Sequence, residues 1–157
     1  MLGSTYEKQN CSAARALELV GERWSLLILR DVLFRGMTRF SELERSLGLA
    51  PNVLAKRLEG FVNSGILEKF TEADDFLNQY RPTQRGLDFK PVIIALTNWG
   101  DRWSAPNGPP VHFEHKECGG HITYELRCKK CNNSVPLRKV FAVPNRGRNS
   151  QRSLNKM

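Results

Sequence analysis

The apolar residues at the start of the chain recur at helical spacing and predict two consecutive helices. Over residues 12–20 they follow one helix face, with Ser12 as the candidate N-cap and Gly21 as the stop signal. The same period resumes at Glu22 and runs to an end signal at Gly36. We therefore expect a short first helix, followed by a second helix that is buried along most of one side.

The next stretch predicts a helix, a tight turn and another helix. A candidate helix begins at Ser41 and stops at Gly48, and Pro51 then stands where a proline of the first helical turn is favoured. In the helix over residues 51–63, one apolar stripe must face the core: Leu54, Leu58, Phe61 and Val62. The opposite side carries polar residues that we expect in solvent: Asn52, Lys56, Glu59 and Asn63.

A hairpin and a longer helix are predicted after this pair of helices. Residues 66–71 and 76–83 have the composition of two strands around an acidic, turn-prone tip, so the hairpin forms a wing. The helix begins at Thr83 or Gln84, with Pro91 close enough to its start to be tolerated or to kink it. Its apolar side carries Leu87, Val92, Ile93, Leu96, Trp99 and Trp103.

Charge and composition narrow the class of protein. The chain carries 24 Lys and Arg against 16 Asp and Glu, and this net charge of +8 favours a polyanionic partner such as DNA. No apolar run approaches the roughly 20 residues that span a bilayer, and the first residues lack the pattern of a signal peptide. We expect a cytoplasmic protein without a membrane partner. Its four cysteines are too few and too clustered for a disulfide scaffold, and are interpreted as metal ligands or reactive thiols.

The helix over residues 51–63 meets the demands on a DNA recognition helix, which buries one face and presents short polar or cationic side chains on the other. Asn52 can pair with adenine or a phosphate, Lys56 can meet guanine or a phosphate, and Ala55 keeps the approach close. Pro51 and Arg57, in the same helix, complete this part of the predicted DNA-binding set, although Arg57 could instead brace the fold.

Two neighbouring segments add candidate contacts to double-stranded DNA. Arg39 and Ser41, at the start of the preceding helix, suit phosphate contacts through the side chain and the helix N-terminus. The wing adds four residues that could reach the backbone or the minor groove: Lys69, Gln79, Tyr80 and Arg81. The alternative for any one of these residues is an ordinary solvated polar surface.

Five short motifs occur in order along the chain: Cys11, Gly21-Glu22-Arg23-Trp24, Arg39-Phe40-Ser41-Glu42-Leu43, Leu54-Ala55-Lys56-Arg57-Leu58 and Trp99-Gly100-Asp101-Arg102-Trp103. In combination they resemble the HxlR family of bacterial winged helix-turn-helix transcription regulators, over roughly residues 11–104. The sequence departs from the usual family pattern at Ala50-Pro51-Asn52, where a start rich in small hydroxyl residues is commoner. The target site is therefore not implied by the resemblance.

The resemblance implies a homodimeric repressor on a near-palindromic operator, with two recognition helices in neighbouring major grooves. The terminal helices would pack together, and the expected interface residues are Leu17, Val92, Leu96, Trp99 and Trp103. For each of them, a place in the intramolecular core is the alternative.

The predicted fold is α+β and mainly α: a winged helix-turn-helix with a two-stranded wing, a long C-terminal dimerisation helix and a small β-ribbon-like extension. Residues 1–104 would form the DNA-binding and dimerisation domain, and the Pro/Gly-rich residues 105–110 would form a linker. Residues 111–143 would form a Cys/His module, and residues 144–157 a disordered basic tail.

Cys11 is the candidate redox-sensing residue. It stands directly before the first helix, where the positive end of the dipole and the free N–H groups favour a thiolate. The resemblance implies a possible response to quinones, aldehydes or oxidants, because some family members sense them through a cysteine at this position. The alternative is an inert, packed thiol.

The extension carries a candidate zinc site. His115 and Cys118 form one knuckle, Cys128 and Cys131 form another, and the nine residues between them could bring four N and S ligands to one tetrahedral zinc. A segment with so few apolar residues would gain its stability from the metal. The alternative is a ribbon with reduced thiols. His112 and His121 are the substitutes if His115 is not a ligand.

Parts of the sequence also resemble two other classes of protein. His112-Phe113-Glu114 with Cys128 and Cys131 superficially resembles the zinc deaminases, but Arg127 stands where that pattern has proline, and residues 111–143 are too few for that domain. We therefore expect no enzyme. The other class is a winged-helix protein-interaction scaffold with a metal-binding ribbon, whose binding would survive loss of Lys56 and Arg57. No residue set identifies an effector.

Overall fold

The computed structural model describes residues 5–7, 9–72 and 75–143, and these form two compact units that divide between Val111 and His112. The expected basic tail, residues 144–157, lies outside the described residues. Each unit is described by itself.

The first two helices largely follow the apolar pattern of the sequence. Helix α1, Ser12–Val20, ends as predicted at Gly21, where a Cβ would lie only 2.5 Å from the carbonyl oxygen of Leu17. Helix α2, Ser25–Phe34, begins three residues later than the expected start at Glu22. The reason is a turn, closed by the bond from the Ser25 N–H to the Glu22 carbonyl at 2.9 Å.

The helix-turn-helix consists of α3, Phe40–Leu47, and α4, Pro51–Asn63. Gly48 closes α3 in the left-handed conformation, at φ 61°, which glycine adopts without the steric cost of a Cβ. Pro51 occupies the first turn of α4, where its missing N–H costs no hydrogen bond. The turn signals of the sequence therefore placed the end of α3 and the start of α4 correctly, while α3 begins at Phe40, one residue before the predicted Ser41.

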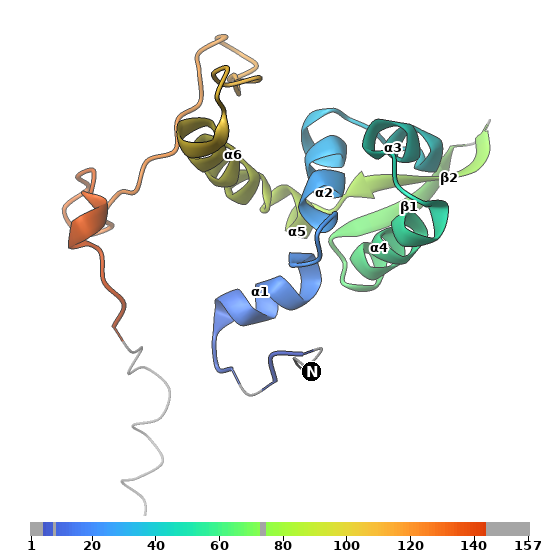
Figure 1. Ribbon diagram of the computed structural model, residues 1–157, viewed down its shortest axis with the longest axis horizontal. Helices are drawn as coiled ribbons and strands as arrows, with labels where there is room; N and C mark the ends of the chain where they lie inside the picture. The colour runs from blue at the N-terminus through green and yellow to red at the C-terminus, as the bar shows by residue number, and fades with distance from the viewer. Residues whose placement is uncertain (1–4, 8, 73–74, 144–157) are drawn as a thin grey trace, which may run out of the picture. The chain divides into compact units, whose positions relative to one another are not determined.

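The wing is an antiparallel pair of strands, β1, Leu67–Glu72, and β2, Asp75–Pro82. A bridge between Arg39 and Gln79 joins the segment before α3 to the other edge of β2, with the Tyr80 N–H donating to the Thr38 carbonyl at 2.7 Å. Figure 1 shows α3 and α4 beside this hairpin.

The prediction of one long helix after the wing is wrong, because the structure has two helices there. They are α5, Gln84–Leu87, and α6, Lys90–Ser104. Pro91 has no N–H to donate to the carbonyl four residues earlier, so the helical hydrogen bonding cannot run through it. The Phe89 N–H instead bonds to the Gly86 carbonyl at 3.0 Å. A Cβ on Gly86 would lie 2.3 Å from the Ile66 carbonyl oxygen, so only glycine fits where α5 approaches the start of the hairpin.

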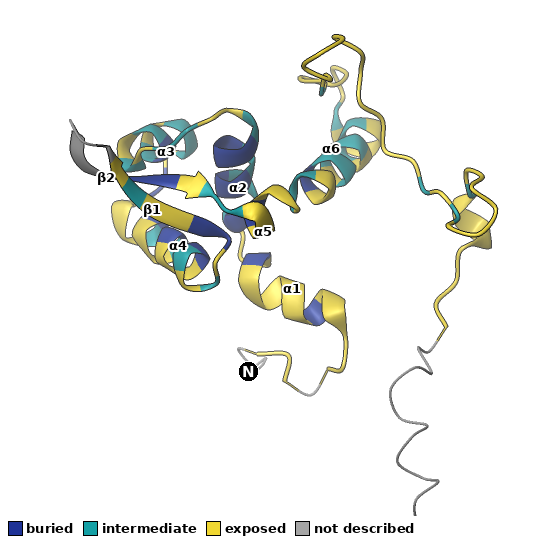
Figure 2. Cartoon of the chain, turned by 180° about the vertical axis from the view of Figure 1, so that it is seen from behind, coloured by how far each residue is buried: buried dark blue, intermediate teal, exposed yellow. Residues whose placement is uncertain are grey.

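The core of the first unit lies between α2, α3, α4 and the hairpin, where Figure 2 shows the buried segments. It contains the predicted apolar stripe of α4 except Val62, which is half-buried: the buried members are Leu54, Leu58 and Phe61. No described helix is long and apolar enough to cross a membrane. The winged helix-turn-helix fold predicted from the sequence is confirmed.

The second unit has little regular structure in its described part, residues 112–143. Two isolated antiparallel bridges, Glu114 with His121 and Arg127 with Ser134, stand where a β-ribbon was expected, and a 3-10 helix, η1, spans Leu137–Lys139. No side chain in this part is buried. Apolar packing therefore contributes little to holding it together.

Candidate nucleic-acid interface

The N-terminus of α3 is fixed by one carboxylate. Glu42 accepts hydrogen bonds from the backbone N–H groups of Arg39, at 2.9 Å, and Thr38, at 3.0 Å. These bonds, the one from Arg39 first, lower the pKa of the Glu42 carboxyl below its usual value. Ser41 lies exposed in the first turn of this helix, and Arg39 is exposed directly before it. Both therefore stand where the sequence predicted phosphate contacts.

Helix α4, the predicted recognition helix, presents its predicted polar face to solvent. Asn52, Ala55 and Lys56 are exposed, and so is Pro51 at the start of the helix. The side-chain oxygen of Asn52 accepts from the Val53 N–H at 2.9 Å, which holds that side chain at the first turn. Burial of the opposite stripe determines which face of α4 is turned outward.

Arg57 is engaged within the fold. Its Nη2 lies 2.8 Å from Glu22 Oε2, so the side chain links α4 to the turn before α2. It is also less exposed than its neighbour Lys56. This arrangement corresponds to the bracing role that the sequence left open for Arg57.

A buried carboxylate that the sequence analysis missed anchors α3 against α2. Asp31 is fully buried and lies 2.8 Å from the Arg30 guanidinium, 3.5 Å from that of Arg35 and 2.7 Å from the Ser46 hydroxyl. The signal was present, since Asp31 is the one acidic residue in the apolar run of residues 25–34. Such a residue needs polar or charged partners, because an unpaired buried charge is costly.

Two of the four wing candidates do not offer the polar surface that the sequence predicted. Gln79 is 4% exposed, and its Oε1 accepts from the Thr38 hydroxyl at 3.0 Å. Tyr80 is 7% exposed and belongs to the core, and this burial raises the pKa of its phenol. Adjacent side chains of a strand point to opposite faces, and here Gln79 is held by the Thr38 hydroxyl while Tyr80 packs in the apolar core. The expectation that Gln79 and Tyr80 reach DNA is corrected accordingly.

The other two wing candidates are exposed cations. Lys69 lies on β1, directly across from Tyr80. Arg81 donates from Nε to Glu68 at 2.7 Å and places its guanidinium 4.9 Å from the ring centre of Phe70. The wing thus keeps two positive side chains at its surface, one of them held by an exposed ion pair.

Cys11, rather than the expected Ser12, is the N-cap residue of α1, and it is exposed. The backbone N–H groups of Ala14 and then Ala13 lower the pKa of its thiol below the usual value. The expected environment, an accessible sulfur at the positive end of a helix, is therefore present.

The five expected interface residues are not part of the core of a single chain. Each is between 47% and 66% exposed, and the tryptophans are the most exposed. The five residues are Leu17, Val92, Leu96, Trp99 and Trp103. The alternative of an intramolecular core is therefore wrong for this set in one chain.

The expected zinc ligands lie together in pairs. His115 Nδ1 lies 3.2 Å from Cys118 Sγ in one knuckle. In the other, the N–H groups of Cys131 and then Lys130, and the Cys131 side chain, lower the pKa of the Cys128 thiol. Among the described residues, however, no group of close ligand atoms joins the two pairs.

The backbone closes both knuckles, the His115–Cys118 pair and the Cys128–Cys131 pair, in the same way. Gly119 follows the first pair at φ 67° and donates its N–H to the His115 carbonyl at 2.8 Å. Asn132 follows the second at φ 55° and donates to the Cys128 carbonyl, also at 2.8 Å. Each pair is thus closed by a residue in the left-handed conformation, which suits a turn that aims two side chains at one ion.

Residues 19–108 match the family described as HxlR-like helix-turn-helix. A Mycobacterium bovis protein described as an uncharacterised HTH-type transcriptional regulator is 40% identical over 138 residues, which cover 87% of each chain. Among solved structures, the candidate transcription factor PA1607 has a TM-score of 0.78 and 30% identity, over 88% of this chain and 97% of that chain.

The transcriptional regulator YodB from B. subtilis is a third similar protein. Its reduced form has a TM-score of 0.52 and 27% identity, over 62% of this chain and 98% of that chain. Its quinone-bound form has a TM-score of 0.50 and 28% identity, over 59% of this chain and 99% of that chain.

Proposed function

The chain belongs to the HxlR-like helix-turn-helix family and is a transcriptional regulator rather than an enzyme, and we propose that it is a homodimeric repressor that binds a near-palindromic operator. It would act where chromosomal DNA lies, in the cytoplasm. A dimer that covers neighbouring major grooves blocks other proteins from that DNA, and this is the basis for proposing repression.

The observation that carries DNA binding is the division of α4 into two faces. The core takes Leu54, Leu58 and Phe61, which leaves Asn52, Ala55 and Lys56 exposed along the other side. A major groove admits one helix, and base edges offer acceptors to a lysine and both donors and acceptors to an asparagine amide. The small side chain of Ala55 allows the helix axis to approach the bases.

Phosphate contacts would set the position of this helix on the duplex. Arg39 and Ser41 stand at the N-terminus of α3, whose backbone dipole favours an anion. Lys69 and Arg81 provide positive charge on the wing. Each neutralised phosphate releases counterions, so the proposal entails binding that weakens steeply with salt.

The dimer would form through the exposed apolar residues of α1 and α6. The surface that they offer in one chain is apolar and aromatic, and a second copy would bury it. Closed twofold symmetry would then fix the spacing of two copies of α4, and with it the spacing of the operator half-sites.

Cys11 would make DNA binding responsive to oxidants or electrophiles. Its support is the exposed sulfur, the lowered pKa of the thiol and the likeness to YodB, which has been solved in reduced and quinone-bound forms. Modification of Cys11 at the N-terminus of α1 would disturb the helix that carries the interface residue Leu17.

The Cys/His knuckles would hold one zinc ion. His115, Cys118, Cys128 and Cys131 supply the nitrogen and three sulfurs of a structural site, and the unit that contains them has no buried side chain in its described part. The segment between the pairs would have to fold so that they meet.

The test is titration of labelled DNA from the gene's own upstream region with the full-length protein, at two salt concentrations and with random competitor DNA. We expect saturable, competitor-resistant and salt-sensitive binding that is lost on oxidation only when Cys11 is present. Binding no tighter than to random DNA would contradict operator recognition and would favour the winged-helix protein-interaction scaffold.

A further inference from the structure

The second unit holds a cluster of metal-binding side chains that is separate from the Cys/His knuckles. Among the described residues, His112, Glu114 and His121 form the one group of three or more whose ligand atoms all lie within 4.8 Å of one another. We propose that they bind a divalent cation of the zinc type through two imidazoles and one carboxylate.

The backbone brings these side chains together. Glu114 and His121 face each other across an antiparallel bridge, flanked by bonds from the His115 N–H to the Gly120 carbonyl and from the Ile122 N–H to the Phe113 carbonyl, both 2.8 Å. His112 precedes Glu114 by two residues, so in extended backbone the two side chains share one side. Three ligands from two segments are thus set by main-chain pairing.

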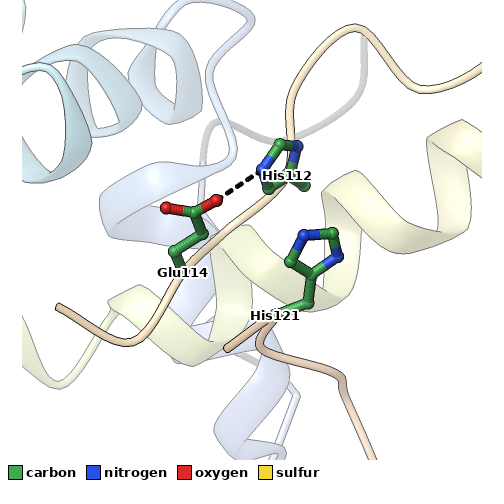
Figure 3. Close-up of side chains that lie close together, drawn as sticks. All are labelled: His112, Glu114 and His121. Carbon is green, nitrogen blue, oxygen red and sulfur yellow. Dashed lines mark hydrogen bonds and ion pairs between the residues drawn. The ribbon is translucent and has the colours of Figure 1, made fainter. Parts of the chain in front are cut away.

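The ligand atoms already stand near the spacing of a coordination sphere. His112 Nε2 lies 2.8 Å from Glu114 Oε1, and the His112 and His121 rings stack with their centres 4.3 Å apart (Figure 3). Ligands at about 2 Å from a tetrahedral ion are roughly 3.3 Å apart, so binding would replace the His112–Glu114 hydrogen bond and turn the stacked rings toward the ion. Two nitrogens with one carboxylate oxygen suit zinc and its neighbours, and solvent would complete the coordination.

His115 does not belong to this cluster. Its Nδ1 contacts Cys118 Sγ at 3.2 Å, and its Nε2 lies 3.9 Å from Glu117. The knuckle and the cluster therefore use different side chains of the same loop, and one can be removed without removing the ligands of the other. The ion would cross-link a loop that has no buried side chain to stabilise it.

The experiment is a cobalt(II) titration of the untagged, metal-depleted full-length protein, followed by absorption and repeated with zinc by calorimetry. Cobalt on thiolates gives an intense sulfur-to-metal charge-transfer band, whereas cobalt on His112, Glu114 and His121 does not. We expect one bound equivalent without that band, lost in His112→Gln and His121→Gln and retained in Glu117→Gln, a matched change at an exposed neighbour.

The thiolate band serves as the internal control. If the band persists in His121→Gln, the knuckles still form. Loss of the equivalent without the band would then be due to the cluster alone. The proposal is overturned if every bound equivalent of cobalt shows the charge-transfer band. It is also overturned if an equivalent without the band is still bound in both histidine variants. Neither outcome bears on DNA binding, which is measured separately.

Discussion

The Oδ2 atom of Asp31 accepts a hydrogen bond from the Ser46 hydroxyl at 2.7 Å and so ties the buried helix α2 to the first helix of the helix-turn-helix. The other carboxylate oxygen lies 2.8 Å from Arg30. A buried charge thus contributes to holding α3 against α2, beside the apolar contacts of the core.

Replacing this charge tests that contribution. We expect Asp31→Asn to lower the free energy of unfolding by about 1–3 kcal/mol, because the amide loses the ion pair with Arg30 and replaces one acceptor oxygen with a donor. Urea denaturation at fixed protein concentration measures the change. Ser46→Ala and the double variant complete a cycle, and a coupling energy near zero between Asp31 and Ser46 would refute the proposed tie.

The carboxylate of Glu42 predicts a dependence of stability on pH. Because its pKa is lowered in the folded chain, its contribution is present above the unfolded pKa of about 4.3 and is lost as pH falls through the folded value. Glu42→Gln should cost about 1 kcal/mol at neutral pH, as for the loss of a helix cap, and progressively less in acid. Glu59→Gln, on the exposed face of α4, should change stability by less than about 0.5 kcal/mol. A Glu42→Gln penalty that does not shrink in acid would argue against this role.

The lowered pKa of Cys11 predicts how fast its thiol is alkylated. The thiolate is the reactive form, so the rate of iodoacetamide labelling should reach half its maximum at a lower pH in the folded protein than in urea. Mass spectrometry of the N-terminal peptide gives the rate at each pH. Equal midpoints in folded and unfolded protein would rule out activation by the helix.

The exposed tryptophans of α6 predict the oligomeric state. Trp99→Ala combined with Trp103→Ala should convert a dimer to a monomer, as measured by light scattering, because it removes the largest apolar side chains of the surface. Phe141→Ala removes an aromatic side chain that is 81% exposed in the other unit and serves as the control. A double variant that stays dimeric would place the interface elsewhere.

The parts of the fold that depend on local signals could be predicted from the sequence. Periodic apolar residues with Gly21, Gly48 and Pro51 located α1 and the helix-turn-helix, because these signals act within one or two helical turns. The outward face of α4 followed from the same period.

The parts that depend on distant contacts could not be predicted in this way. Gln79 is covered by its hydrogen bond to Thr38, and Tyr80 packs in the apolar core, and the pattern within the strand does not reveal either of these distant neighbours. The proximity of His121 to His112 likewise follows from a bridge that spacing alone does not specify.

The most direct test of DNA binding through α4 is the salt dependence of operator affinity for wild type, Lys56→Ala and the charge-retaining Lys56→Arg. We expect Lys56→Ala to bind more weakly and to reduce the slope of log affinity against log salt by about one, while Lys56→Arg keeps the wild-type slope. Unchanged affinity and slope in Lys56→Ala would contradict the assignment of the exposed face of α4 to DNA.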